Sequence, residues 1–129
     1  MPAPVVTPVQ SLPRVLTAGS GRVTTRAAVG PGERVFPGHY PGFPIFPGVC
    51  VVEHVHLSAL AAPPEPEAVL RLEAIESTRF LSPVFPGDEL EVELTWEQKD
   101  GRWRCKGVAS TGRGRAAAVR LRFTERSGR

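Results

Sequence analysis

The sequence predicts one small domain built mainly on an antiparallel β-sheet. Its 129 residues match a single ordinary domain, and a second core would have too little surface to bury. Apolar residues make up 41% of the chain and charged residues 22%, a balance typical of globular rather than disordered proteins. The second half of the chain carries the clearest pattern, because apolar and polar residues alternate along three successive segments.

These three segments predict an antiparallel meander with one buried and one polar face. Apolar or small side chains occupy every second position over residues 90–96, 103–109 and 117–123. Glycine-containing turn sequences separate the segments and precede the first of them, at residues 86–88, 100–101 and 112–114. Residues 68–80 are a further long strand candidate.

The first half of the chain gives weaker signals. Residues 12–17 and 22–29 form a candidate strand pair, joined by residues 18–21. Residues 49–62 contain no Gly or Pro. Their length and their alanine-rich end favour a helix, whereas the β-branched start suits a strand. Periodicity alone leaves that assignment open.

The ends of the chain are expected to lie outside the folded core. We interpret residues 1–10, which are rich in proline, as a flexible arm, residues 11–125 as the single domain, and residues 126–129 as a frayed tail. No apolar run approaches the roughly 20 residues that span a bilayer, and no signal-peptide pattern opens the chain. The expectation is a cytoplasmic protein without membrane association.

Cysteine usage and charge limit the disulfides, cofactors and binding partners that are expected. Cys50 and Cys105 stand far apart in apolar surroundings, which favours two buried, reduced thiols over a disulfide. No His/Cys cluster has metal spacing, so neither a metal nor another cofactor is predicted. The net charge is +3, with arginines concentrated after residue 101. The excess of positive charge is consistent with an acidic partner protein or simply with the solvent-exposed face of a sheet. No nucleic-acid-binding motif accompanies it.

The chemistry is expected to lie in a segment rich in proline and glycine, residues 36–48, and just after it. His39 is the histidine of that segment, and an imidazole that titrates near neutrality suits proton abstraction. Gly48 would open a helix whose first N–H groups are available to a carbonyl oxygen that gains negative charge. Glu53 follows, flanked by valines, as a candidate proton donor. Alone, His39 would be read as a structural turn residue and Glu53 as an ordinary helix carboxylate.

Two spaced motifs resemble the 3-hydroxyacyl-acyl carrier protein dehydratases of type II fatty-acid and polyketide synthesis. The first is GHYPGFPIFPGVCVVE, which contains His39, Gly48 and Glu53 at the family spacing. The second is RFLSPVFPGD, which begins at Arg79. The two motifs stand in the family order, and the likeness covers nearly all of the chain beyond the arm.

The resemblance implies an α+β hot-dog fold, a curved antiparallel sheet wrapped around one long central α-helix over residues 48 to about 60. It also implies a dimer in which His39 of one subunit faces Glu53 of the other. His39 would take the C2 proton, Glu53 would protonate the leaving 3-hydroxyl, and the Gly48 N–H would hold the thioester oxygen. Acyl carrier protein would be the partner. Further candidates are the acyl-tunnel residues Phe43, Phe46, Leu57 and Phe80 and the carrier-docking residues Arg79, Arg102 and Arg104.

Position 57 and its neighbours depart from the family pattern and keep other functions open. The family often has Gln where this chain has Leu57, and small residues where it has His54 and His56. The latter two are read as surface or interface residues. The alternatives are a hot-dog thioesterase and a non-catalytic acyl-binding subunit paired with a paralogue. Acyl chain length, pathway and assembly beyond a dimer are not predicted.

Overall fold

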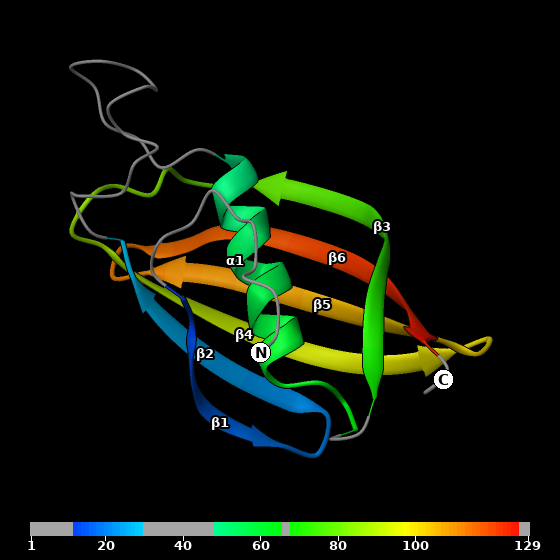
Figure 1. The fold of residues 1–129 in the computed structure, drawn as a ribbon. Coiled ribbons are helices and arrows are strands. Elements are labelled where there is room, and N and C mark those ends of the chain that lie inside the picture. The colour runs from blue at the N-terminus through cyan, green and yellow to red at the C-terminus, as the bar shows by residue number, and fades with distance from the viewer. Residues whose placement is uncertain (1–11, 30–47, 66–67, 127–129) are drawn as a thin grey trace, which may run out of the picture.

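The computed structural model describes residues 12–29, 48–65 and 68–126. These residues form one helix and six strands (Figure 1). In chain order the elements are β1 (Arg14–Gly19), β2 (Arg22–Ala28), α1 (Gly48–Ala61), β3 (Val69–Phe80), β4 (Glu89–Lys99), β5 (Arg102–Thr111) and β6 (Gly114–Arg126). No helix in these described ranges is long and apolar enough to cross a membrane.

All six strands belong to one antiparallel sheet in the order β1-β2-β4-β5-β6-β3. The sheet curves around α1, which lies across its concave face (Figure 1). The predicted meander is therefore confirmed as β4, β5 and β6, and β1 and β3 are the two edges of the sheet. This arrangement is the expected α+β hot-dog fold.

Two hairpin turns follow directly from local sequence. Ser20-Gly21 and Asp100-Gly101 each place both turn residues at positive φ, with values of 51°, 76°, 53° and 74° along the chain. Two consecutive residues at positive φ give the turn whose twist matches the right-handed twist of the flanking strands. These turns set the register in which β2 joins β1 and β5 joins β4.

Residues 48–61 are helical, which settles the assignment that periodicity left open. Cys50, Val55 and Ala59 of α1 are fully buried in the main hydrophobic cluster, together with residues of the sheet. Two hydrogen-bonded links add to this apolar contact. The Trp96 indole N–H donates to the Ala62 carbonyl at 3.1 Å, and Thr25 Oγ1 lies 2.7 Å from Ser58 Oγ in the core.

The helix approaches the sheet closely because Gly107 has no side chain. A Cβ at this position of β5 would lie 2.5 Å from Val55 Cγ1 and 3.1 Å from Leu94 Cδ2. The space above Gly107 is therefore filled by Val55 of α1, which fixes how deeply the helix lies on the sheet.

Two further expectations can be compared with the structure. Cys50 and Cys105 are buried thiols, as predicted, and burial raises the pKa of Cys105 to about 12. The last strand, however, runs to Arg126, one residue into the segment that we expected to be a tail. Pairing of Arg126 with Val69 of β3 extends the ladder to that point.

Candidate active site at the amino-terminal half of the helix

A cavity of about 460 Å³ opens at the first turn of α1. It is lined by Gly48 and Val51 of the helix, by residues 80–84 after β3, and by Ala116 of β6. Gly48 begins the helix, so its N–H is one of the amides that no preceding helical turn uses. The second sequence motif thus contributes one wall of the cavity and the first motif contributes the helix start.

Gly48 and Phe80 are in close contact at the mouth of this cavity. A Cβ on Gly48 would lie 2.7 Å from Cζ of the Phe80 ring, closer than real Cβ contacts. Phe80 is nevertheless 55% exposed, because β3 is an edge strand. Phe80, predicted as an acyl-tunnel residue, is therefore beside the helix start.

Glu53 lies about one and a half turns further along α1, on the side of the helix that is only partly buried. Its Oε1 is 2.9 Å from His56 Nδ1, and the side chains of Glu53 and His56 are 22% and 23% exposed. His56, expected at a surface or an interface, contacts the predicted acid. The spacing of three residues on a helix was the available signal.

The other two residues that depart from the family pattern point into the core. Leu57 is 7% exposed and belongs to the main hydrophobic cluster. His54 is 1% exposed, so the expected surface or interface position is wrong for this residue. Leu57 was predicted to line the acyl tunnel, but it is not among the residues around the cavity at Gly48.

Three predicted site residues, His39, Phe43 and Phe46, lie outside the described residues. Of the predicted catalytic and tunnel residues, the structure describes Gly48, Glu53, Leu57 and Phe80. The role of His39 as the base stays a prediction.

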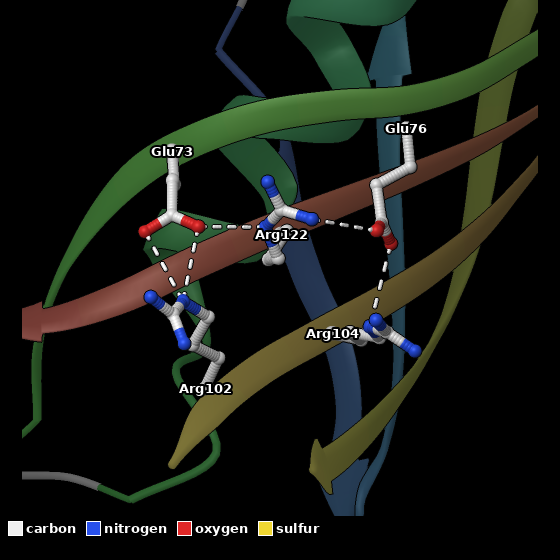
Figure 2. A network of polar contacts seen from close by, with 5 residues as sticks. All are labelled: Glu73, Glu76, Arg102, Arg104 and Arg122. Carbon is white, nitrogen blue, oxygen red and sulfur yellow. Dashed lines mark hydrogen bonds and ion pairs between the residues drawn. The ribbon is translucent and has the colours of Figure 1, made fainter. Parts of the chain in front are cut away.

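The predicted docking arginines occupy two different surroundings. Arg102 and Arg104 lie on β5, in the positions that alternate with the buried Cys105, so they project from the sheet face opposite α1. Figure 2 shows both beside carboxylates of β3: Arg102 Nε lies 3.0 Å from Glu73 and Arg104 Nε 3.5 Å from Glu76. Arg79 is exposed, next to Phe80 at the end of β3.

Arg122 of β6 joins these pairs into one five-residue ion-pair network. Its guanidinium lies between the two carboxylates, 2.7 Å from Glu73 and 3.1 Å from Glu76 (Figure 2). The positive charge predicted for this face is thus partly neutralised by the acids of β3.

Asp88 and Arg113 form a separate hydrogen-bonded ion pair next to the segment after β3 that lines the cavity. Asp88 accepts hydrogen bonds from the Phe85 N–H at 2.7 Å and from Arg113 at 2.6 and 2.8 Å. The Arg113 hydrogen bond holds the pKa of Asp88 below its ordinary value of 3.8, against a smaller opposing effect of burial. Arg113 also donates to the Pro83 carbonyl, so it ties the turn at residues 85–88 to the cavity segment. Arg113 is not among the site residues that the sequence predicts.

The sequence of the chain matches a family of known proteins. The family model described as the ApeI dehydratase, ApeI-like, matches residues 16–116. The chain belongs to the ApeI-like dehydratase family.

Curated relatives of this ApeI-like chain carry the name 3-hydroxyacyl-[acyl-carrier-protein] dehydratase FabZ. The Symbiobacterium thermophilum protein is 39% identical over 116 residues, covering 85% of this chain and 82% of that protein. A Polaromonas protein is 33% identical over 129 residues, covering 93% and 89%.

Solved structures support the fold of the ApeI-like chain. A chain of the dehydratase heterocomplex ApeI:P from Xenorhabdus doucetiae superposes with a TM-score of 0.70 at 19% identity, covering 90% of this chain and 99% of that one. The Escherichia coli PaaI protein from the phenylacetic acid degradation operon gives 0.74 at 14% identity, covering 90% and 80%. At these identities the likeness concerns the fold.

Proposed function

We propose that this chain removes water from 3-hydroxyacyl thioesters on acyl carrier protein and produces trans-2-enoyl thioesters. The observation that carries the proposal is the placement of Glu53 on the partly exposed side of α1, five residues after Gly48, which lines the cavity at the start of the helix. Membership of a dehydratase family and the FabZ relatives support the same reaction.

Each step of the reaction is given to a separate group. His39 removes a proton from C2, and the electron pair of that C–H bond forms the C2–C3 double bond. Glu53 gives its proton to the 3-hydroxyl oxygen, the C3–O bond breaks, and water leaves. The Gly48 N–H donates to the thioester oxygen, which gains negative charge as the C2 proton departs. Both proton transfers are general acid–base steps.

A second copy of the chain is proposed to complete the site, with His39 of one subunit facing Glu53 of the other. The helix face that carries Glu53 also exposes Val49 (68%) and Leu60 (41%), one turn before and two turns after the acid. The adjacent edge strand β3 exposes Ile75 (51%) and Phe80 (55%). Large apolar side chains exposed on a helix and on the neighbouring edge strand are features that native proteins tend to cover. A paralogous subunit in place of the second copy is the competing assembly.

Dehydration is tested directly with the purified full chain and a 3-hydroxyacyl carrier protein. Intact mass should fall by one water, and Glu53→Gln or His39→Ala should lower the rate by roughly a hundredfold to ten-thousandfold. The exposed Glu97→Gln is the matched control and should retain the wild-type rate.

The other outcomes separate the alternatives. Release of a free acid would identify a thioesterase. Dehydration that occurs only after a paralogue is added would replace the homodimer by a heteromer. Complete inactivity under both conditions would support the non-catalytic subunit and overturn the proposal.

Arg79 is proposed as a docking residue for the acidic carrier protein, because it is exposed and adjacent to the cavity residue Phe80. Arg79→Glu should raise KM for the carrier-bound substrate more than KM for a small thioester mimic. Arg102→Glu and Arg104→Glu are the comparison variants, since both arginines already have carboxylate partners. If Arg79→Glu changes KM equally for the carrier-bound substrate and for the small thioester mimic, docking at Arg79 is refuted.

A further inference from the structure

Glu53 is in contact with one polar side chain of its own helix, His56. The two residues are three apart on the partly exposed side of α1, and His56 Nδ1 lies 2.9 Å from Glu53 Oε1. His54 and Leu57, the other large residues close to the acid along the chain, are buried in the core at 1% and 7% exposure. His56 is therefore the helix residue placed to orient the carboxyl.

The imidazole of His56 is itself held in place by an aromatic contact. Its ring stacks on Phe123 with the centroids 6.0 Å apart and the planes at 30°. Phe123 is fully buried on β6 and packs against Trp96 with the centroids 5.5 Å apart. The stack on Phe123 restricts the plane of the imidazole ring, and within that plane Nδ1 lies at hydrogen-bond distance from Glu53.

We propose that His56 is a positioning residue for the acid, an inference that rests on the proposed dehydration. The Nδ1–H donates to Oε1 of Glu53, so the acidic proton of the carboxyl is carried by Oε2, which faces the substrate. When the Oε2–H bond breaks and the proton passes to the departing hydroxyl, Glu53 becomes a carboxylate. The hydrogen bond from His56 is then charge-assisted and stronger, so it favours the proton transfer.

Two substitutions separate this role from simple packing. His56→Phe keeps a ring that can stack on Phe123 and removes the nitrogen. His56→Asn keeps a nitrogen donor near the position of Nδ1 and removes the ring. Positioning of Glu53 predicts that His56→Phe lowers kcat roughly tenfold to a hundredfold with KM nearly unchanged, the size expected for a lost hydrogen bond to a charged group. His56→Asn should recover most of that loss.

The opposite ranking would refute positioning. If His56→Phe retains the wild-type kcat and His56→Asn is the impaired variant, the residue acts by packing on Phe123. Thermal unfolding of both variants distinguishes either result from loss of the fold. An inactive wild-type protein would overturn the proposed reaction. The contact between His56 and Glu53 is then tested by NMR, which needs no turnover.

Nitrogen NMR of the histidine rings tests the contact without any turnover. The His56 signal, assigned by its loss in His56→Asn, should report a protonated Nδ1 and should shift in Glu53→Ala. Glu97→Gln is the control and should leave the signal in place. A protonated Nε2 with a bare Nδ1, or no response to Glu53→Ala, would overturn the proposal even in an active enzyme.

Discussion

Asp88 shows how one carboxylate can organise a wall of the site. It accepts from the Phe85 amide inside its own turn and from both terminal nitrogens of Arg113, whose guanidinium also lies 5.0 Å from the centre of the Phe85 ring. Asp88, the last residue of the second sequence motif, thus also binds Arg113 from the turn between β5 and β6. Because Arg113 reaches the Pro83 carbonyl, this contact extends to the cavity segment.

This pair predicts a stability difference that depends on pH. The pKa of Asp88 is lowered from 3.8 in the folded protein, so its contribution to stability is present above that pH and is lost as pH falls through the lowered pKa. Asp88→Asn should therefore lower the urea midpoint at pH 7, and the difference from wild type should shrink in acid. The adjacent exposed Glu89→Gln serves as the control. A difference that stays constant down to pH 2 would show that the charge of Asp88 is not involved.

Among the elements, the long edge strand β3 pairs with its neighbour β6 in an irregular register. Its register with β6 shifts between Leu72 and Ala74 and again between Ile75 and Ser77. The extra residues at these two bulges are Glu73 and Glu76, the carboxylates that hold Arg122 of β6. Bulges bend a strand and increase its twist, so the ion-pair network lies where β3 curves around α1 (Figures 1 and 2).

The contact between α1 and the sheet predicts a large effect from one added methyl group. Gly107→Ala would place a Cβ within 2.5 Å of Val55, so the helix or β5 must shift. The free energy of unfolding should fall by about 1–3 kcal/mol, as for overpacked cores. Gly112→Ala is the matched control, because a Cβ there has no atom within 4 Å, and its effect should stay within about 0.5 kcal/mol. Equal effects of the two substitutions in urea titrations would contradict the close approach.

At the scale of the whole molecule, the two sheet edges differ in what they expose. β3 is twelve residues long and borders the helix face of Glu53, whereas β1 has six residues at the far edge. Ile75 and Phe80 at the β3 edge are each more than half exposed. A subunit that adds to β3 would cover these side chains and bring a second chain to the acid, and one that adds to β1 would not.

The proposed dimer can be tested with one charge at each edge. Ile75→Glu should shift the sedimentation of the protein from dimer towards monomer and lower dehydration in parallel, because the subunit that supplies His39 is lost. Leu16→Glu on β1, at 38% exposure, is the matched control and should remain dimeric. Dissociation by Leu16→Glu with an intact Ile75→Glu dimer would place the interface at the opposite edge.

Much of the sheet was predictable from the sequence, because strand alternation and hairpin turns are local properties. Leu90, Val92, Leu94 and Trp96 are all buried, as their spacing predicts. The order of the edge strands was not predictable in this way. Residues 68–80 were correctly expected to form a strand, but their pairing with β6 and the two bulges depend on the register between residues 37 (Phe80 and Ala117) to 57 (Val69 and Arg126) positions apart.

For the site, the sequence by itself determined the residue types and their spacing: Gly48 and Glu53 in one motif and Phe80 in the other. Periodicity and propensity within residues 49–62 left helix and strand open, the family resemblance implied a helix, and the tertiary structure shows α1 over residues 48–61. The deciding factor is burial of its apolar face against the sheet, which periodicity within the segment does not contain. The tertiary structure also directed Leu57 into the core and left His56 on the face of Glu53. Which face of a helix is covered depends on what packs against it, and that is set by the curved sheet of the whole chain.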